Sequence, residues 1–342
     1  MRVAGGGVKV LVGIDIGGTK TAVALGAPSR SSPNIAAGLS VIERSAFPTD
    51  TRVPWREHIR HIIDSIRALM ARVGVQPSEI LGMGVSCGGP LDSRAGLILS
   101  PPQLPGWDRV PLTATLGEAF GMRVFLQNDA NACALAEWLY GAGKGCRNMV
   151  LLTFGTGMGA GLILDGRLYE GTNDLAGEVG HMRLAEDGPE EYGKRGSFEG
   201  LCSGSGIAKL ARIAVAESLA RGERVSFCPD AAAIPSITTR AVGEAAAAGD
   251  SLAREVLAAS GRSLGRGLAV LIDVLNPERI VIGSIYVRCR EFLQPTMEEE
   301  IRREALPLAA AVCTVVPAAL GEQIGDYASL AVAARGPAGG TE

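Results

Sequence analysis

Two short stretches of this chain, about 140 residues apart, share one pattern: an apolar run, a turn rich in glycine and threonine, and a second apolar run. The first stretch spans Leu11 to Leu25 and the second spans Met149 to Leu164. Each pattern predicts a β-hairpin, and glycines in its turn let the backbone approach a ligand closely. Backbone N–H groups and threonine hydroxyls in such a turn can bind phosphate oxygens. The duplication therefore predicts two halves that hold one nucleotide.

Taken singly, each stretch reads as an ordinary glycine hairpin. Neither turn is a Walker P-loop of the form G-x-x-x-x-G-K-[ST], and neither is a G-x-G-x-x-G motif that leads into a helix. The nucleotide interpretation therefore depends on the repetition, on Asp15 before the first turn, and on the residues that follow each copy.

Composition narrows the class of protein. The chain has 342 residues, of which 47% are hydrophobic and 20% charged, and this suits two globular domains with ample core. The net charge is −3 without a basic tract, so we expect no nucleic-acid partner. No apolar run is long enough to span a membrane, and the first residues lack the apolar segment of a signal peptide. We expect a cytoplasmic protein with reduced thiols, because its seven cysteines are scattered.

Alternating strand and helix signals predict an α/β fold with mixed sheets. Apolar residues at helical spacing predict a helix from Trp55 to Val73, on which His58 and His61 are expected to be solvated or packed. Further helices are predicted at Thr113–Phe120, ended by Gly121, and at Ala130–Tyr140, Asp250–Leu275 and Tyr327–Ala334. Strands are predicted at Ile35–Ala46, Ile80–Val85, Val124–Leu126, Ile280–Ile282 and Cys313–Val316. An irregular stretch is expected from Gly171 to Gly200, and fraying after the last helix.

Four motifs follow one another along the chain: Asp-x-Gly-Gly-Thr-Lys at 15–20, Asn-Asp-Ala-Asn at 128–131, Gly-Thr-Gly-x-Gly at 155–159 and Gly-Glu-x-Gly-His at 177–181. Their order resembles the ROK family of bacterial sugar kinases and related repressors, within the actin-like ATPase superfamily. The resemblance runs from about Val8 to about Ala334. It implies two ribonuclease-H-like domains that flank an active-site cleft for ATP and sugar. The N-terminal domain would span residues 8–127, completed by a helix near 326–336, and the C-terminal domain residues 128–325.

The resemblance also implies the nucleotide contacts. Asp15 matches the carboxylate that helps to hold Mg²⁺ near the phosphates. The first phosphate loop would be formed by Gly17, Gly18, Thr19 and Lys20, and the second by Gly155, Thr156, Gly157 and Gly159. Gly283-Ser284 falls where the family has a glycine-rich turn near the adenosine, but only one glycine is present here.

Asp129 is the candidate for the chemistry. Transfer of a phosphoryl group to a sugar requires a group that takes the hydroxyl proton, and a carboxylate at the end of a strand suits this task. From the residues alone, Asp129 or Asn128 could equally cap the helix that follows. The resemblance implies that Asp129 is the general base and that Asn128 binds a sugar hydroxyl.

The remaining sugar contacts also come from the resemblance. It implies that Glu178, His181 and Glu199 bind sugar hydroxyls and that Gly88 and Gly89 line the same pocket, with Ser100, Gln103 and Trp107 as possible neighbours. Buried polar groups of this kind penalise a sugar that lacks the matching hydroxyl. The alternative for His181 is a hydrogen-bonded core histidine.

Many members of the family follow this histidine with Cys-x-Cys-Gly-x-x-Gly-Cys-x-Glu, and three thiolates and the histidine then bind a structural Zn²⁺. In this chain the corresponding stretch is EEYGKRGSFEG, with Tyr192 and Ser197 where ligands are expected. Cys202 is the nearest cysteine and could at most be a stray ligand. We therefore expect no structural zinc site and a loop that is held by packing.

The resulting expectation is an ATP-dependent, Mg²⁺-using hexose kinase that acts on the 6-hydroxyl of glucose. N-acetylglucosamine, N-acetylmannosamine, mannose and fructose remain open as substrates. One alternative is a repressor that binds sugar and DNA, and another is a sugar sensor without catalysis. Because only seven residues precede Val8, we expect no winged helix, and Asp15 and Asp129 favour catalysis. A homodimer is the family-based expectation.

Overall fold

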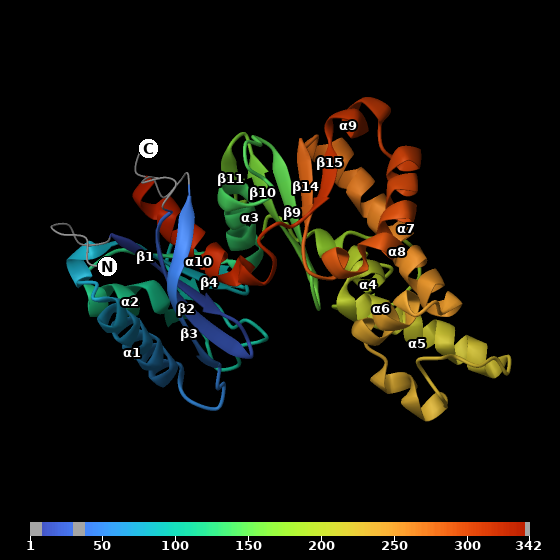
Figure 1. The fold of residues 1–342 in the computed structure, drawn as a ribbon, viewed down its shortest axis with the longest axis horizontal. Coiled ribbons are helices and arrows are strands. Elements are labelled where there is room, and N and C mark those ends of the chain that lie inside the picture. Colours follow the sequence, from blue (N-terminus) through green and yellow to red (C-terminus); the bar gives the residue numbers. More distant parts are fainter. Residues whose placement is uncertain (1–8, 30–37, 339–342) are drawn as a thin grey trace. The chain divides into compact units, whose positions relative to one another are not determined.

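The computed structural model describes residues 9–29 and 38–338. The chain divides into two compact units, drawn in Figure 1. Unit 1 comprises the residues up to 145, residues 161–176 and those from 319 onward, and unit 2 comprises residues 146–160 and 177–318. Residues 129–145 and 161–176 thus pack with unit 1, whereas the sequence placed them after a boundary at 128. The expected beginning of a strand at Ile35 lies outside the described residues.

Unit 1 is built on a five-stranded mixed sheet with the strand order β3-β2-β1-β4-β8. Its strands are β1 (Val10–Ile16), β2 (Lys20–Pro28), β3 (Leu39–Pro48), β4 (Ile80–Cys87) and β8 (Val124–Asn128). β1 and β2 form the first predicted hairpin, and β1, β4 and β8 run parallel, with Ile16 beside Cys87 and Cys87 beside Asn128. The carboxyl ends of these three strands therefore lie at one edge of the sheet, which is where ligands bind in many α/β folds.

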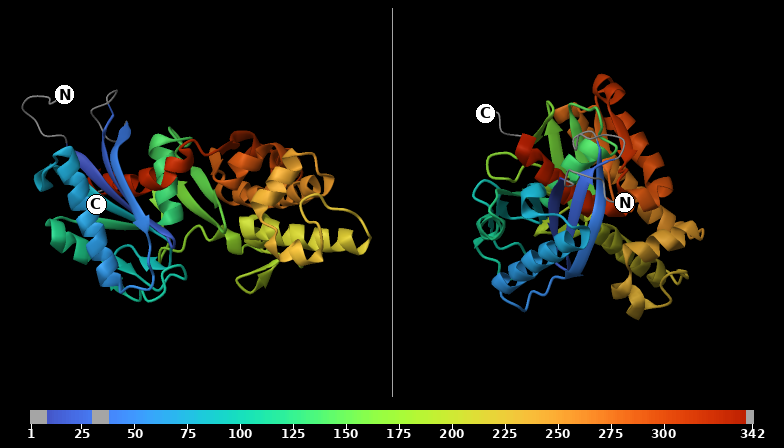
Figure 2. Two further views of the ribbon diagram at one scale, coloured as in Figure 1. Left: turned by 60° about the horizontal axis from the view of Figure 1, so that its bottom comes forward. Right: turned by 60° about the vertical axis from the view of Figure 1, so that its left-hand side comes forward.

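Helices cover both faces of the unit 1 sheet (Figures 1 and 2). Helices α1 (Trp55–Val73) and α2 (Leu112–Phe120) pack on the face formed by alternate residues such as Val12 and Ile14. The predicted bounds of α1 are confirmed, and Gly121 ends α2 in a left-handed conformation as predicted. A small sheet of β5 (Leu91–Asp92), β6 (Leu97–Ile98) and β7 (Val110–Pro111) precedes α2.

The opposite face of the sheet carries α10 (Ile324–Ala338), with Leu330 and Ala333 packed on Leu11. This helix approaches β4 so closely that a β-carbon at Gly84 would lie 2.3 Å from the backbone nitrogen of Ala333. Glycine at this position is therefore required by the packing. Helix α3 (Asp129–Tyr140) follows β8 directly and packs beside α10.

A second sheet has the strand order β11-β10-β9-β14-β15. Its strands are β9 (Met149–Phe154), β10 (Met158–Leu164), β11 (Arg167–Tyr169), β14 (Arg279–Ile282) and β15 (Thr314–Pro317). β14 runs parallel to both β9 and β15. The predicted second hairpin thus corresponds to β9 and β10, and the two strands predicted after the long helix are confirmed within one or two residues.

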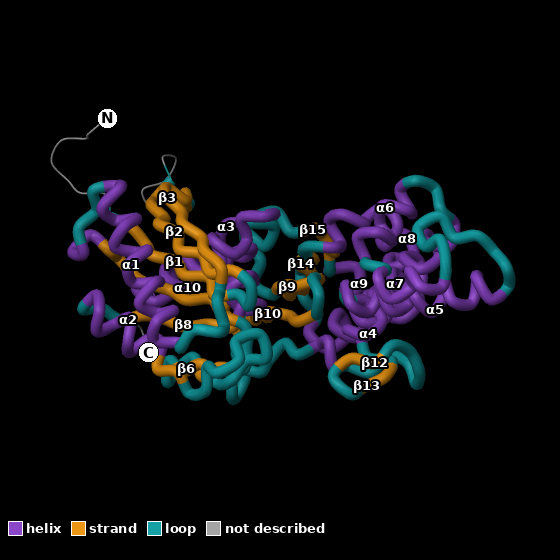
Figure 3. Tube along the Cα trace, turned by 90° about the horizontal axis from the view of Figure 1, so that it is seen from below, coloured by secondary structure: helices purple, strands orange, loops and turns teal. Residues whose placement is uncertain are grey.

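Unit 2 also contains several helices, drawn in purple in Figure 3. Its helices are α4 (Phe198–Cys202), α5 (Gly204–Ala220), α6 (Thr239–Ala247), α7 (Ser251–Leu275), α8 (Ile285–Glu304) and α9 (Pro307–Val312). The side chain of Asp250 caps α7 by accepting a bond from the N–H of Ala253, and Asn276 ends the helix in a left-handed conformation. The predicted long helix is therefore confirmed, although it begins one residue later than predicted, because Asp250 is its cap.

The stretch expected to be irregular, residues 171–200, contains short ordered elements. They are the 3-10 turn η2 (Val179–His181) and a two-stranded hairpin of β12 (Glu190–Glu191) and β13 (Lys194–Arg195). Other 3-10 turns are η1 (Pro77–Glu79), η3 (Ala231–Ser236) and η4 (Gly321–Gln323). Within residues 9–29 and 38–338, no helix is long and apolar enough to cross a membrane.

Candidate functional site

The backbone of the first glycine turn, residues 17–19, is held by two hydrogen bonds from Thr49. The hydroxyl of Thr49 donates to the carbonyl of Gly17 over 2.7 Å, and the N–H of Thr49 donates to the carbonyl of Thr19 over 3.0 Å. Thr19 and Lys20 are exposed at the edge of the sheet. The turn therefore has a fixed backbone while one hydroxyl and one ammonium group remain available to an anion.

His58 takes part in this support. Its ring is buried, and Nε2 lies 2.9 Å from the hydroxyl of Thr21, which in turn lies 2.8 Å from the hydroxyl of Thr49. Burial lowers the pKa of His58, which favours a neutral ring at this position. The expectation that His58 is a packed residue is confirmed, and the structure adds a hydrogen-bonded link to the glycine turn.

Asp15 occupies the end of β1, where its carboxylate lies close to the start of α10. A β-carbon at Gly325 would lie 2.6 Å from its Oδ2. Burial raises the pKa of Asp15 to about 6, the hydrogen bond with Ser86 opposes this shift, and the carboxylates of Asp129 and Asp326 add to it. Asp15 is thus a carboxylate with little compensating positive charge, and a cation would favour its ionised form.

Asp129 begins α3 directly after β8. Its Oδ1 accepts a bond of 2.8 Å from the N–H of Ala130, and Oδ1 of Asn128 accepts a second bond of 2.9 Å from the same group. Both residues therefore cap the helix, as the simpler of the two sequence interpretations predicts. Asp129 is exposed to solvent, yet desolvation by the surrounding protein raises the pKa of its carboxyl, partly opposed by the bond from Ala130.

Gln103 connects the other predicted residues of unit 1. A β-carbon at Gly18 would lie 2.8 Å from Cβ of Gln103, and one at Gly88 would lie 2.0 Å from Nε2 of Gln103 and 3.7 Å from Oδ2 of Asp129. Gln103 thus lies against both the first glycine turn and the end of β4, and Gly88 lies between Gln103 and Asp129. Gly89 lies beside Asn128, because a β-carbon there would be 3.3 Å from Nδ2 of Asn128.

Two of the proposed neighbours do not contribute free polar groups. Trp107 is buried and packs its ring edge-on against the ring of His58, with centroids 5.5 Å apart. The hydroxyl of Ser100 donates to Asp108 over 2.9 Å. Trp107 therefore supports the first glycine turn through its contact with His58. The bond between Ser100 and Asp108 closes the loop that contains Trp107.

The second glycine turn, residues 155–157, lies in unit 2 and is fixed by the start of α5. The N–H of Gly204 donates to the carbonyl of Gly155 over 2.8 Å, and the N–H of Ser205 donates to the carbonyl of Thr156 over 3.1 Å. Thr156 and Gly157 are exposed. Gly159, on β10, exchanges bonds with the hydroxyl of Thr153. Like the first glycine turn, the second one has a backbone held by hydrogen bonds and two residues that are exposed to solvent.

Glu199 borders this second turn. Its Oε2 accepts a bond of 2.7 Å from the N–H of Met158, and a β-carbon at Gly157 would lie 2.9 Å from the same oxygen. A cavity of about 230 Å³ lies between these groups, lined by Thr156, Gly157, Glu191, Tyr192, Glu199 and Ser205. The cavity presents carboxylates and hydroxyls, and such groups suit the hydroxyls of a polyol.

Glu178 and His181 are both exposed at η2. The ring of His181 lies beside that of Tyr192, with centroids 5.5 Å apart, and Nζ of Lys194 donates to the carbonyl of His181 over 2.7 Å. His181 is therefore an accessible residue at the β12–β13 hairpin, and the alternative of a core histidine does not fit its exposure.

The β12–β13 hairpin occupies the stretch where the resemblance to the ROK family implied zinc ligands. Glu191 forms an ion pair of 2.7 Å with Lys209 on α5 and accepts a bond from the hydroxyl of Ser205. Cys202 is fully buried with its thiol directed at the carbonyl of Ser260. Among the described residues no group of three His, Cys, Asp or Glu side chains could hold a metal ion, so this donor set does not fit zinc.

Gly283 follows β14, and its N–H donates to the carbonyl of Leu152 over 3.1 Å. A β-carbon there would meet only atoms 3.8 Å away or more. Ser284, at the start of α8, has a φ of 52°. This turn therefore lies beside β9 in unit 2 and has space around its glycine.

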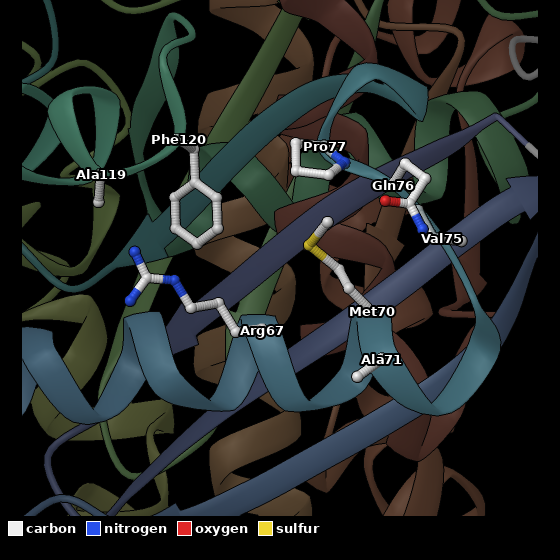
Figure 4. Close-up of a pocket in the computed structure, with 8 residues that line it drawn as sticks. All are labelled: Arg67, Met70, Ala71, Val75, Gln76, Pro77, Ala119 and Phe120. Atoms are coloured by element: carbon white, nitrogen blue, oxygen red, sulfur yellow. The ribbon is translucent and has the colours of Figure 1, made fainter.

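A separate hollow of about 410 Å³ lies between the ends of α1 and α2 (Figure 4). Met70, Val75, Pro77 and Phe120 give it apolar walls, and the guanidinium of Arg67 lies 5.8 Å from the ring of Phe120. None of the residues predicted to bind nucleotide or sugar lines it. We therefore assign it no part in the site.

Comparison with known proteins gives the family. Residues 11–335 match the ROK family. The chain is 30% identical over 316 residues to a glucokinase of Halalkalibacterium halodurans, covering 92% of both chains. It is 28% identical over 247 residues to the DNA-binding transcriptional repressor Mlc of Escherichia coli, covering 72% of this chain and 59% of the repressor.

Solved structures agree with this match. The ROK hexokinase of Thermus thermophilus superposes with a TM-score of 0.77 at 28% identity, covering 97% of this chain and all of the hexokinase. A ROK glucokinase of Streptomyces griseus, in complex with glucose and AMPPNP, has a TM-score of 0.68 at 25% identity and covers 95% and 99% of the two chains. The fold is the mixed α/β fold of these kinases, and the chain belongs to the ROK family.

Proposed function

We propose that the chain transfers the γ-phosphoryl group of ATP to the 6-hydroxyl of glucose or a closely related hexose, with Asp129 as the general base. The broader class, an ATP-dependent sugar kinase of the ROK family, follows from the similarity to glucokinases over nearly the whole chain. The observation that carries the role of Asp129 is its position: an accessible carboxylate of raised pKa at the end of β8, close to Asp15 and the first glycine turn.

In the proposed reaction, Oδ2 of Asp129 takes the proton of the 6-hydroxyl while the sugar oxygen attacks the γ-phosphorus. The bond between the γ-phosphorus and the bridging oxygen of ADP breaks, so that sugar 6-phosphate, ADP and a proton on Asp129 result. Oδ1 keeps its bond from the N–H of Ala130, which fixes the carboxylate during the transfer. A raised pKa makes Asp129 a stronger base than an ordinary carboxylate.

The two glycine turns are the proposed phosphate contacts, through the exposed residues Thr19 and Lys20 of the first turn and Thr156 and Gly157 of the second. Asp15 fits a Mg²⁺ ligand, since it is a largely buried carboxylate near two other carboxylates. Mg²⁺, when bound, neutralises charge on the phosphates. The proposed sugar ligands are Asn128, Glu178, His181 and Glu199.

Asp15→Asn should abolish most activity and at the same time stabilise the apo protein. Because the pKa of Asp15 is raised, the folded state binds its proton more tightly than the unfolded state, so ionisation of Asp15 destabilises the fold increasingly from about pH 4 and fully above about pH 6. We expect a gain of about 1 kcal/mol at pH 7.5 after allowance for solvent screening, vanishing near pH 4. Urea unfolding at both pH values measures it, and equal changes at both would contradict the assignment.

The choice of sugar is tested by ADP release with five substrates: glucose, mannose, fructose, N-acetylglucosamine and N-acetylmannosamine. We expect the highest kcat/KM for glucose, because the named relatives with the greatest coverage are glucokinases. A higher value for an acetylated sugar would replace glucose as the substrate and leave the kinase class intact. Turnover of none of the five would favour the sugar-sensor alternative.

A second candidate function, a transcriptional repressor, is favoured by similarity to repressors, of which Mlc is one. The match leaves about two fifths of that repressor uncovered, and the described residues contain both carboxylates that the kinase proposal needs. An ATP and hexose turnover assay separates the two functions.

Sedimentation of the protein tests the proposed homodimer, and metal analysis after purification without added metals tests the proposed absence of zinc.

A further inference from the structure

A fully buried carboxylate closes the last turn of α3. Glu137 has no exposed surface. Its Oε2 accepts bonds from the N–H groups of Ala142, over 2.7 Å, and Ala319, over 3.2 Å, and its Oε1 accepts a bond of 2.9 Å from the N–H of Leu320. A buried carboxylate is costly unless such bonds compensate its lost hydration. Three donors from the main chain therefore define a specific role for this side chain.

The three donors belong to two segments that are far apart in sequence. Ala142 lies in the segment through which the chain leaves unit 1 after α3, just before residue 146. Ala319 and Leu320 are the first residues after the chain returns to unit 1 from unit 2. The carboxylate of Glu137 thus binds both the segment where the chain leaves unit 1 and the segment where it returns to unit 1.

Gly141 gives independent evidence that this contact is built into the fold. A β-carbon at Gly141 would lie only 2.0 Å from Oε2 of Glu137. The carboxylate therefore folds back over the end of its own helix through space that any other residue at 141 would fill. The carbonyl of Glu137 also accepts bonds from the N–H groups of Gly141 and Gly143, so the exit segment is held twice.

The re-entry segment leads directly to the nucleotide side of unit 1. After Leu320 the chain forms η4 and then α10, whose Gly325 lies against the carboxylate of Asp15. The next residue, Asp326, is fixed by an ion pair of 2.7 Å with Arg44. Helix α3 packs beside α10 (Figure 1) and carries Asp129 at its other end. Glu137 therefore ties the helix of the proposed base to the segment that places α10 against Asp15.

We propose that Glu137 is a positioning residue for phosphoryl transfer, which holds both segments so that Asp15 and Asp129 keep their mutual placement. It does not touch the reacting atoms. Because displacements of about 1 Å at a catalytic group can cost about two orders of magnitude in rate, loss of this clamp should act on kcat. The kinetic part of the proposal rests on the proposed function, and the structural part does not.

The test is Glu137→Gln, because a glutamine presents an amide donor to at least one of the main-chain donors. We expect kcat to fall by about tenfold or more while KM for the sugar changes by less than about twofold. Deuterium exchange in the absence of substrates should rise at Ala142, Ala319 and Leu320. Glu118→Gln, the same change on the exposed side of α2, is the matched control and should alter neither kcat nor this exchange.

Gly141→Ala disturbs the same contact, because its methyl group would occupy the space of the Glu137 carboxylate. This variant replaces Glu137→Gln in the test if Glu137→Gln does not fold. It should reproduce the loss of kcat and the increased exchange, and the double variant should lose less than the product of the two single effects. Unchanged exchange at the three amides, or increased exchange with wild-type kcat, would overturn the proposal. If the wild-type protein phosphorylates no sugar, the proposed function fails, while the exchange data still decide whether Glu137 holds the two segments.

Discussion

Asp129→Asn is expected to lower kcat for sugar phosphorylation by about 10²–10⁴-fold, the usual contribution of a general base. Asparagine has nearly the same shape, and its Oδ1 can keep the bond from the N–H of Ala130 that caps α3. Folding and sugar binding should therefore remain close to those of the wild type. Initial-rate kinetics give kcat, and calorimetric titration of the sugar gives the affinity.

The control for this variant is Glu118→Gln, which removes one negative charge from an exposed position on α2 and should leave kcat unchanged. A folded Asp129→Asn protein that keeps more than about a tenth of the wild-type kcat would show that Asp129 only caps the helix. A loss confined to sugar affinity would instead place Asp129 among the binding groups and leave the base unidentified.

Gly84→Ala is expected to lower the free energy of unfolding by about 3 kcal/mol or more, at the upper end of overpacking effects. The added β-carbon would lie 2.3 Å from the nitrogen of Ala333 and 2.5 Å from the carbonyl oxygen of Ser329. Both are main-chain atoms of α10, so neither can rotate away. Urea unfolding followed by circular dichroism measures the loss.

The matched control is Gly74→Ala at the end of α1. Gly74 has a φ of 74° but no atom within 4 Å of its potential β-carbon, so the variant reports only the cost of the left-handed conformation, about 1–2 kcal/mol. Equal losses for the two variants would mean that α10 shifts to accommodate the methyl group. The close approach of α10 to the sheet would then not require glycine at position 84.

Elements with a strong local signal were predictable from sequence. The apolar spacing of α1 gave bounds that the structure reproduces, and the predicted start of α7 differs from the observed one by a single residue. Helix α8 was not recognised, because Pro295 lies inside it and Cys289 interrupts its regular backbone. The hairpin at Tyr192 and Gly193 was expected to be irregular, since its strands are only two residues long and lack apolar alternation.

The site was predictable where a motif carried it and not where distant segments meet. The glycine turns and Asp129 were found from their motifs, and whether they bind ATP and sugar stays a prediction. The support of the first turn by Thr49 and His58 joins residues about 30 positions apart, which no local pattern reveals. Glu137 sits in an alanine-rich helix that indicated only helix formation, and the glycines at 141 and 143 were the only hint of a folded-back carboxylate.

The position of α10 has a consequence for synthesis on the ribosome. Leu11, Ala24 and Leu39 precede unit 2 along the chain, but the helix that covers them, through Leu330 and Ala333, follows it. All of unit 2 is made in between. This face of the first sheet must therefore remain without its partner until unit 2 has been translated, so unit 1 can complete its fold only after the ribosome has produced all of unit 2.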